Sequence, residues 1–527
     1  MASGRSVRML LGVLALFGAL SARATAADQP APRVRRPNVI LFLVDDMGWR
    51  DCGVYGSTFY ETPHIDAFAR KAMRFTDAYA QPLCSPTRAS LMTGKYSARH
   101  GITSATGHQP PQPEGFQFLP ETAPPGQAMR TPVSKNYLEP SEYTLAEALR
   151  DAGYRTAHIG KWHLGLTSPH WPEQQGFEIA FHCHPDPGPP GGYFSPYGVR
   201  RTGEPKGQLR VGTITDGPDG EYIVDRQAEE AVKFIETRSD KPFFLNLWCY
   251  GVHGPWGHKE AYTREFQARI DANARQKNPI MASMMRSVDE CFGKILAAVE
   301  KNGLADDTII VFNSDNGGNV HSNTAGDAEA RPRRAPNPAL ADWKKWAGNE
   351  APTSNWPLRD GKGTLYEGGT RVPLMWSWPG RIAAGATNAS VVGHIDLYPT
   401  LLELAGIPRP KQQQMDGESY ASVLRGTGPI ARDAFFNYFP HGRSPGRAGG
   451  VWVRRGDRKL IRWFGTPPEQ RFELYDLKAD LAETTNLAAT SSEEVRQLDA
   501  LIDDFLKETG ATSPRDNPAF EAQSPSR

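Results

Sequence analysis

Four segments of the chain share one plan, a short apolar and β-branched run that stops abruptly at charged or imidazole side chains. They are "NVILFLVDD" from Asn38, "RTAHIGKWHLG" from Arg155, "PFFLNLWCYGVHGPW" from Pro242 and "TIIVFNSDNGG" from Thr308. Continuous apolar runs of this length are typical of buried strands in a parallel sheet. Helical patterns separate the runs, for example over residues 143–154 and 281–304. This alternation predicts an α/β fold with a large mixed, mostly parallel sheet sandwiched by helices.

The predicted strands end in polar residues that could share one crevice. In open α/β sheets the ligand site lies beyond the carboxyl ends of the strands. Each residue alone is weak evidence, because an Asp-Asp pair and an Asp-Asn-Gly-Gly sequence are also common turns. Their shared position predicts one site. The residues at or just past the strand ends are Asp45, Asp46, Lys161, His163, His253, Asp315 and Asn316.

Two of these strand ends supply an all-oxygen set of candidate metal ligands. Oxygens of Asp45, Asp46, Asp315 and Asn316 suit Ca²⁺ or Mg²⁺, and they suit softer metals poorly. A divalent cation would remove the repulsion among clustered carboxylates. With basic groups around it, such a site fits a tetrahedral oxyanion ester, either a sulfate or a phosphate. The basic side chains expected there are Arg88, Lys95, Lys161, His163, His253 and Lys362.

The N-terminus predicts export. Two arginines precede an apolar run over residues 9–20, and "ATA" at 24–26 matches a small-residue cleavage site. We therefore expect a signal peptide over residues 1–26 and a linker over 27–36. An uncleaved anchor helix fits less well, because the run is shorter than the roughly 18 apolar residues that a spanning helix needs. The mature chain is expected in the periplasm or outside the cell, or in the lysosome of a eukaryote, with no membrane span.

The length of the chain predicts more than one hydrophobic core. We expect a catalytic domain over residues 37–430 and a small C-terminal α+β domain with an antiparallel sheet over 431–510, where short strand patterns precede a helical one. The Pro/Ser-rich tail, residues 511–527, is expected to be disordered. The formal net charge of +1 gives no field that would attract nucleic acid or an anionic membrane.

Cysteine usage raises a question about Cys84. The chain has five cysteines, and an odd number in an oxidising compartment leaves at least one unpaired or chemically altered. In "QPLCSPTRASLMTGKY", Pro86 is suited to a first helical turn and Gly94 to a helix end, so Cys84 is expected at a helix N-terminus that favours an anion. A low-pKa thiolate and a buried structural cysteine are two interpretations. Neither suits a site of hard oxygen ligands.

"CSPTRASLMTG" resembles the Cys-x-Pro-Ser/Thr-Arg signature of the type I sulfatases of the alkaline phosphatase superfamily, a family that includes the arylsulfatases. In that family an export-linked enzyme converts this cysteine to Cα-formylglycine. The resemblance covers residues 37–505. Six further landmarks occur in the family's order: "NVILFLVDDMGW", "GKWHLG", "GVHGPW", "SDNGG", "RDGKGTLYEGGTRVP" and "ELYDLKADLAETTNLA".

The resemblance implies an enzyme that hydrolyses a sulfate ester of a carbohydrate or an aryl group and releases inorganic sulfate. Its cofactor would be Ca²⁺, with Mg²⁺ as the alternative, and its partner would be a formylglycine-generating or equivalent sulfatase-maturing enzyme. The aldehyde hydrate at position 84 would present oxygens, which resolves the mismatch of a soft thiol beside hard ligands. By resemblance the cation ligands are Asp45, Asp46, Asp315, Asn316 and the modified Cys84.

The resemblance also implies roles for the basic residues. Arg88 would hold the hydrate, while Lys161, His253 and Lys362 would bind the sulfate group. One hydrate oxygen would attack sulfur, and His253, helped by Lys362, would protonate the departing alcohol. His163 would then take the proton from the second oxygen, whose collapse to the aldehyde expels sulfate.

The chain departs from the family at a few positions. Trp49, Arg50 and Cys52 lie where aromatic, small and apolar residues are common in the family. Lys95 is equally suited to catalysis and to a structural pairing with the acidic cluster.

Long Pro/Gly-rich insertions over residues 104–141, 184–220 and 326–358 separate the core elements, and loops over a strand-end crevice commonly carry specificity. They could form a sugar-stacking and anion-binding rim, or be ordinary surface loops. The residues concerned are Trp343, Trp346, Trp356, His182, His184, Arg200 and Arg201.

Two other functions stay open from the sequence. A phosphoester or phosphonate monoester hydrolase of the same superfamily would use a similar site, because sulfate and phosphate esters share shape and metal needs. A catalytically silent protein that binds sulfated glycans is the second alternative, in a host that lacks the modifying enzyme.

Overall fold

The four apolar runs form adjacent parallel strands of one sheet. They are β1 (Asn38–Val44), β4 (Arg155–Gly160), β6 (Phe243–Trp248) and β7 (Thr308–Ser314), in the spatial order β7-β1-β6-β4. The side chains of β1, β6 and β7 are buried along their whole length. Both faces of these strands are therefore covered, which explains why their sequences are continuously apolar. The computed structural model describes residues 36–182, 188–189, 192–197, 214–325, 327, 338–442 and 448–521.

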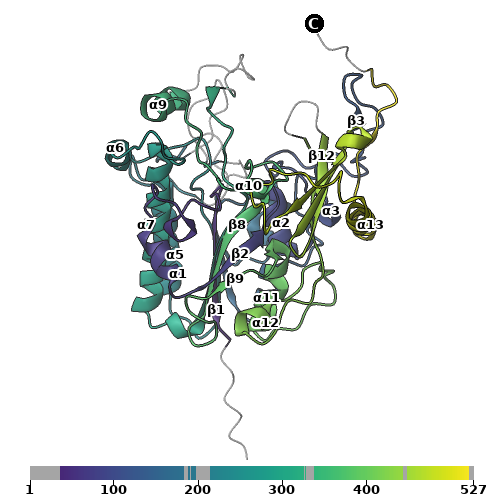
Figure 1. Ribbon diagram of the computed structural model, residues 1–527. Coiled ribbons are helices and arrows are strands. Elements are labelled where there is room, and N and C mark those ends of the chain that lie inside the picture. The colour runs from purple at the N-terminus through teal and green to yellow at the C-terminus, as the bar shows by residue number, and fades with distance from the viewer. Residues whose placement is uncertain are drawn as a thin grey trace, which may run out of the picture. The chain divides into compact units, whose positions relative to one another are not determined.

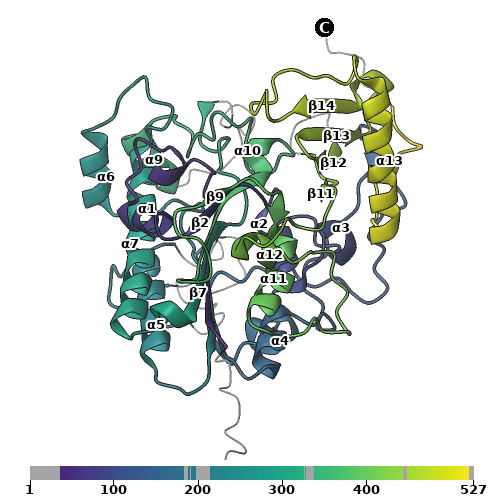
Figure 2. The same cartoon turned by 60° about the horizontal axis from the view of Figure 1, so that its bottom comes forward.

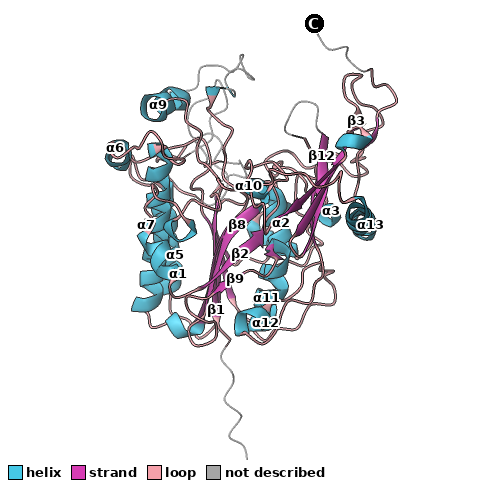
Figure 3. Cartoon of the chain, in the orientation of Figure 1, coloured by secondary structure: helices cyan, strands magenta, loops and turns pink. Residues whose placement is uncertain are grey.

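Five more strands complete a nine-stranded sheet of order β10-β2-β8-β7-β1-β6-β4-β5, with β9 beside β2. Figure 3 shows the strands in magenta and the surrounding helices in cyan. The strand β8 runs antiparallel to both β7 and β2, and the other pairings are parallel. The prediction of a mixed, mostly parallel sheet is confirmed. The added strands are β2 (Met73–Tyr79), β5 (Ile179–His182), β8 (Arg371–Ser377), β9 (Thr387–Asn388) and β10 (Val392–Gly393).

Helices cover both faces of the sheet (Figure 1). Ile40, Phe42 and Val44 of β1 pack on one side against α1 (Pro63–Ala69), α5 (Ile223–Glu236) and α7 (Pro279–Lys301). The alternate side chains of β1 face the other way, because successive residues of a strand point to opposite faces. They join the core formed with α2 (Cys84–Thr93), α4 (Leu145–Asp151), α11 (Leu397–Leu404) and α12 (Ala421–Arg425).

Short helices and several 3₁₀ turns complete this part of the chain, and α6 (Glu260–Gln267) and α9 (Pro338–Ala347) add side chains to the core on the α7 side. Within the described residues, no helix combines the length and the apolar character needed to cross a bilayer. The other short helices are α3 (Ser97–His100) and α10 (Glu367–Thr370). The 3₁₀ turns are Gly53–Tyr55, Ser168–His170, Pro172–Gln175, Ala305–Asp307, His394–Asp396 and Pro468–Gln470.

The C-terminal part forms the predicted antiparallel sheet with a helix alongside it (Figure 2). The strands β11 (Phe435–Phe439), β12 (Ala448–Arg455), β13 (Arg458–Phe464) and β14 (Phe472–Asp476) pair in chain order. One apolar face of α13 (Ser492–Thr509) packs on this sheet in a third core. Contacts join residues 37–527 into one compact unit, and a domain boundary at residue 430 stays a prediction.

The chain after α13 differs from the predicted disorder of residues 511–527. The strand β15 (Arg515–Asp516) pairs antiparallel with β3 (Met129–Arg130). The side chain of Asn517 donates to the carbonyl oxygens of Ala123, Pro124 and Gln127 at 2.8–3.2 Å. Composition alone could not reveal this order, because the pairing partner is remote in the sequence. Residues 522–527 and the predicted signal peptide lie outside the described residues.

A buried ionic cluster connects the C-terminal sheet to the loop before β8. Lys459 of β13 donates to Glu367 of α10 and to Glu483, each at 2.8 Å, and all three side chains are fully buried. The backbone N–H of Glu367 also donates to Glu483 at 2.7 Å. Because an unpaired buried charge is costly, each member of this cluster requires the others.

We predict that Lys459→Met strongly destabilises the protein. The substitution leaves the buried Glu483 carboxylate without a cation, whereas Glu367 keeps its pairing with Arg371 at 2.6 Å. Breaking a buried ion pair in this way costs about 3–5 kcal/mol of unfolding free energy. Lys71→Met is the matched control, because Lys71 and its partner Glu300 are 73% and 64% exposed, and an exposed pair contributes at most about 1 kcal/mol. Urea unfolding midpoints check this prediction, and equal shifts in the two variants would contradict it.

Candidate active site

The carboxyl ends of β1 and β7 bring three carboxylates together. Asp45 and Asp46 follow β1, Asp315 follows β7, and all three are buried. The backbone N–H of Asp315 donates to the Val44 carbonyl at 3.2 Å, and the backbone N–H of Asp46 donates to the Asp315 carboxylate at 3.0 Å. Asp46 has a φ of 65°, in the left-handed region that aspartate tolerates better than most residues. The adjacent parallel strands thus create a buried acidic centre.

Basic side chains from other elements neutralise these acids. Arg88 of α2 donates to the Asp315 carboxylate from Nη2 at 2.7 Å and from Nε at 3.2 Å, and its guanidinium lies 5.0 Å from the ring centroid of Trp248. Lys161, just past β4, donates to Asp45 at 2.6 Å. Buried charges are tolerated only when they are paired in this way.

Lys362 completes the set, with its Nζ 2.5 Å from the Asp46 carboxylate. Burial alone would raise the pKa of Asp46, but the charges of Lys362, His253 and Lys161 lower it below its ordinary value. The pKa of Asp315 is instead raised to about 6, by burial and by the charge of Asp45. The acids therefore differ in how strongly their surroundings favour the ionised form.

Cys84 lies at the start of α2, beside the acidic centre. The helix spans Cys84–Thr93 and is followed by Gly94, which has a φ of 70°, so the predicted position of Cys84 at a helix N-terminus is confirmed. One ligand atom each of Cys84, Asp45 and Asp315 lie within 4.8 Å of one another. Burial raises the pKa of the Cys84 thiol despite nearby lysines. These surroundings do not favour a low-pKa thiolate.

His163 faces Cys84, with its Nδ1 3.3 Å from Sγ. Its backbone has a φ of 59°, which turns the chain sharply after Lys161. Burial and the charge of Lys161 lower the pKa of His163 well below its ordinary value, so the imidazole is neutral near pH 7. A neutral imidazole with Nδ1 directed at residue 84 can accept a proton from it.

A second histidine, which the sequence did not single out, contacts His163. Nδ1 of His108 lies 3.1 Å from Nε2 of His163, and the two rings stack with their centroids 5.4 Å apart. The chain before it needs a glycine, because a Cβ on Gly107 would meet the His163 carbonyl oxygen at 1.9 Å. His108 lies in the long 104–141 insertion, and nothing in its local pattern indicated this contact.

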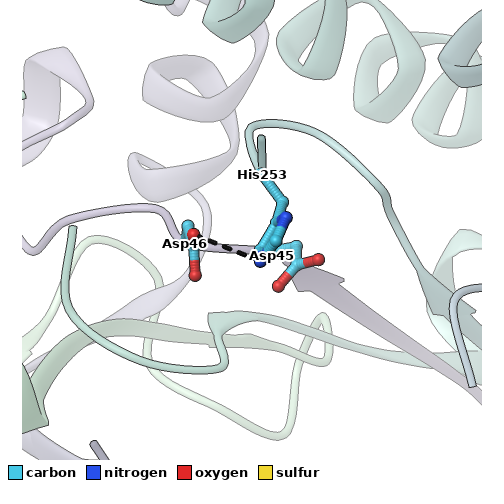
Figure 4. Close-up of side chains that lie close together, drawn as sticks. All are labelled: Asp45, Asp46 and His253. Carbon is cyan, nitrogen blue, oxygen red and sulfur yellow. Dashed lines mark ion pairs between the residues drawn. The ribbon is translucent and has the colours of Figure 1, made fainter. Parts of the chain in front are cut away.

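His253, past the end of β6, closes the site opposite Asp46 (Figure 4). Its Nε2 lies 3.7 Å from the Asp46 carboxylate. Its Nδ1 is 2.5 Å from the Gly254 carbonyl oxygen, which can only accept, so Nδ1 carries the proton. Burial and the charge of Lys362 lower the pKa of His253 to about 3. Its side chain is 15% exposed, whereas those of Arg88 and Lys161 are fully buried.

The oxygen atoms of the centre fit a hard cation. Asn316 donates to Asp46 at 2.8 Å, but its own Oδ1 is buried without a hydrogen-bond partner, and so is Oδ1 of Asp45. Buried acceptors are rarely left without a partner in folded proteins. Carboxylate and amide oxygens are the ligands that Ca²⁺ and Mg²⁺ prefer. The predicted ligand residues thus lie together and retain free acceptor atoms.

Lys95 does not belong to the site. Its Nζ donates to both carboxylate oxygens of Glu142, at 2.8 and 2.6 Å, so the predicted choice between catalysis and pairing with the acidic cluster was wrong. The ten other candidates converge through the contacts above. The local sequence could not reveal this, because Glu142 is 47 residues away in the sequence.

The prediction of a sugar-stacking and anion-binding rim was wrong for two of its three tryptophans. Trp343 and Trp346 are 1% and 8% exposed and belong to the core, whereas Trp356 is 49% exposed. The amphipathic helix α9 turns the first two indoles inward, where Trp343 packs on Trp256. The predicted rim residues His184, Arg200 and Arg201, and the side chain of His182, lie outside the described residues. The described cysteines are free and buried: Cys52, Cys84, Cys249 and Cys291.

Comparison with known proteins identifies the family. A family model described as Sulfatase matches residues 37–407, and one described as N-sulphoglucosamine sulphohydrolase, C-terminal, matches residues 358–509. The chain belongs to the sulfatase family. A sulfatase of Formosa agariphila is 30% identical over 90% of this chain and 89% of its own length. N-acetylgalactosamine-6-sulfatase of Rattus norvegicus is 32% identical over 78% of this chain and 68% of its own length.

Solved structures agree with the fold. The crystal structure of Ps i-CgsB in complex with k-i-k-neocarrahexaose matches with a TM-score of 0.68 and 24% identity, over 93% of this chain and 96% of that one. The sulfatase family that the sequence motifs predicted is confirmed by the family model. The family model and the curated sulfatase relatives show that the chain is a hydrolase of sulfuric esters.

We predict that His108→Ala lowers kcat of this sulfatase about 10-fold to 100-fold and changes KM little. The substitution removes the group that orients His163 through Nε2, and loss of such an orienting partner commonly has this magnitude. His108→Asn should restore part of kcat, because a carboxamide can place a polar atom near the position of Nδ1. Steady-state kinetics on an aryl sulfate check this prediction.

His441→Gln is the control for the His108 variants, since His441 contacts Thr103 in the same region at 2.8 Å but does not touch His163. A similar loss of kcat in His441→Gln would contradict the prediction, because it would show that kcat depends on the packing of the 104–141 insertion and not on the contact between His108 and His163.

Proposed function

We propose that this sulfatase removes sulfate from a sulfated carbohydrate with Cα-formylglycine hydrate at position 84 as the nucleophile. The observation that carries the proposal is the position of Cys84, within reach of Asp45, Asp315 and His163. In this geometry Sγ stands in for the hydrate oxygens. A thiol at this place has a raised pKa and would be a poor nucleophile, whereas a hydrate oxygen suits both the acids and the imidazole.

The basic residues then have distinct tasks. Arg88 holds the hydrate and the Asp315 carboxylate together. Lys161, Lys362 and His253 bind the sulfate oxygens. One hydrate hydroxyl gives its proton to the nearby Asp315 carboxylate, and its oxygen attacks sulfur as the S–O bond to the alcohol breaks. His253, whose Nε2 carries no proton beforehand, receives one from Lys362 and gives it to the departing alcohol. His163 takes the proton of the second hydrate oxygen through Nδ1, the aldehyde re-forms, and sulfate leaves.

A divalent cation, Ca²⁺ or alternatively Mg²⁺, would be held by the side chains of residues 45, 46, 84, 315 and 316. When bound, it would stabilise negative charge that develops during transfer. The charges of the chain support this assignment. The three carboxylates of Asp45, Asp46 and Asp315 balance the three cations of Arg88, Lys161 and Lys362. A divalent ion would make the centre net positive and complementary to a sulfate ester.

A carbohydrate is the favoured substrate class. The rat relative is named for a 6-sulfated amino sugar, and the neighbouring structure holds an oligosaccharide. We also propose that the chain is exported through residues 1–26 and that a formylglycine-generating or equivalent maturing enzyme modifies Cys84. Both follow from the N-terminal pattern and from the Cys-x-Pro-Thr-Arg sequence.

Rates on paired substrates test the proposal. We predict that the matured enzyme hydrolyses an aryl sulfate at least about 100-fold faster than the corresponding aryl phosphate, and that Cys84→Ala loses at least about 1000-fold of kcat, as expected when a covalent nucleophile is removed. Preference for the phosphate would favour a phosphoester or phosphonate hydrolase. Binding of sulfated sugars without any turnover would favour a silent glycan-binding protein.

A further inference from the structure

An exposed tryptophan lies between two arginines. Trp356 is the only tryptophan among the exposed large apolar side chains of the described residues. The guanidinium carbons of Arg50 and Arg275 lie 5.0 and 5.7 Å from the centroid of its ring. Cation–π attraction holds a guanidinium over an indole in this way. We call these three residues the Arg-Trp-Arg cluster.

The cluster carries positive charge that no carboxylate neutralises. In the part of the chain that the structure describes, neither arginine makes an ion pair. Arg50 donates only to backbone carbonyls, from Nε to Gly56 at 2.8 Å and from Nη1 to Trp356 at 3.1 Å. Arg275 is exposed. A guanidinium in this state prefers an oxyanion, which it can bind through two parallel hydrogen bonds.

The three segments of the cluster are joined beneath the surface. The buried side chain of Gln276, next to Arg275, donates to the Asp51 carboxylate at 2.7 Å and lies 3.3 Å from the Arg50 carbonyl oxygen. The Asp51 carboxylate also accepts from the hydroxyl of Thr353 at 2.6 Å. The arginines and the indole are thus held on a common scaffold before any ligand arrives, which reduces the entropy lost on binding.

The same scaffold connects the cluster to the catalytic centre. Arg50 follows the candidate metal ligand Asp46 by four residues, so their Cα atoms are at most about 14 Å apart. Asn355, which precedes Trp356, donates to the carbonyl of Gly318 at 3.0 Å, and the backbone N–H of Lys362 donates to that same oxygen at 3.0 Å. The segments that carry the cluster therefore lie next to those that carry the candidate metal ligand Asp46 and the candidate sulfate-binding residue Lys362.

We propose that the Arg-Trp-Arg cluster binds a second oxyanion of the substrate, a sulfate or a carboxylate on a neighbouring sugar. The inference rests on the proposed function and narrows its substrate class to polyanionic saccharides. The indole orients the guanidinium groups, and the charge selects the ligand.

The test compares three disaccharides that share one cleavable sulfate. The first has no other charge, the second has an additional sulfate, and the third has a uronate carboxylate. We expect the double variant Arg50→Gln/Arg275→Gln to raise KM about tenfold for the second and third disaccharides, which carry an additional anionic group. This is the loss expected when a charged hydrogen bond is removed. The kinetics of the double variant on the singly sulfated disaccharide and on an aryl sulfate should be unchanged.

Arg381→Gln is the matched control. The guanidinium carbon of Arg381 lies 5.8 Å from the ring centroid of Trp378, which repeats the arginine–tryptophan pair. Trp378 follows β8, and Ser377 of β8 pairs with Ile310 near the start of β7. The Arg381–Trp378 pair therefore lies at the amino ends of the parallel strands, whereas the candidate site residues lie at their carboxyl ends. This variant should behave like the wild type on every substrate.

Each outcome decides the proposal. A raised KM for one charged disaccharide supports it and identifies that anion as the ligand, and a raised KM for both supports the shared chemistry. Equal losses on the aryl sulfate, or no loss on any substrate, would overturn it. If the wild type hydrolyses no sulfate ester, the proposed function fails. The cluster is then tested by calorimetry of the same disaccharides on Cys84→Ala, where an affinity unchanged by the arginine substitutions would overturn it.

Discussion

Burial of three carboxylates at the ends of two adjacent strands is the constraint on which the rest of the structure depends. Like charges repel, and removal from water costs each of them free energy. Arg88, Lys161 and Lys362 offset this cost, and they come from α2, from the end of β4 and from the loop before α10. The acidic centre is tolerable only when these elements are in place, so the fold and the site assemble together.

The same principle extends to the C-terminal sheet. Lys459 pairs with Glu367 and Glu483 in a buried cluster in which Arg371 also pairs with Glu367, and Glu367 follows Lys362 by five residues. The sheet therefore fixes the loop that carries the candidate site residue Lys362, although it supplies none of the ten candidate site residues itself. We infer that the second family match, over residues 358–509, reflects this connection between loop and sheet. Charge pairing across segments links distant parts of the chain to one centre.

The sequence predicted those strands and site residues that a local pattern of apolar and polar residues determines. Continuous apolar runs revealed β1, β4, β6 and β7, and their polar ends located the acids. The strand β2 was not predicted, because its formation depends on pairing with β8, which is remote in the sequence. His108 could not be found, since its role depends on a loop closing over His163. The burial of Trp343 likewise depends on packing that no local pattern shows.

The central claim is that residue 84 is an oxygen-bearing aldehyde when the enzyme acts. Mass spectrometry of the tryptic peptide Phe75–Arg88, from active protein purified out of its native host, tests it most directly. We predict the mass of an aldehyde or its hydrate in place of the thiol, in a fraction that rises in proportion to specific activity. Full activity in protein whose Cys84 retains an intact, alkylatable thiol would contradict the account.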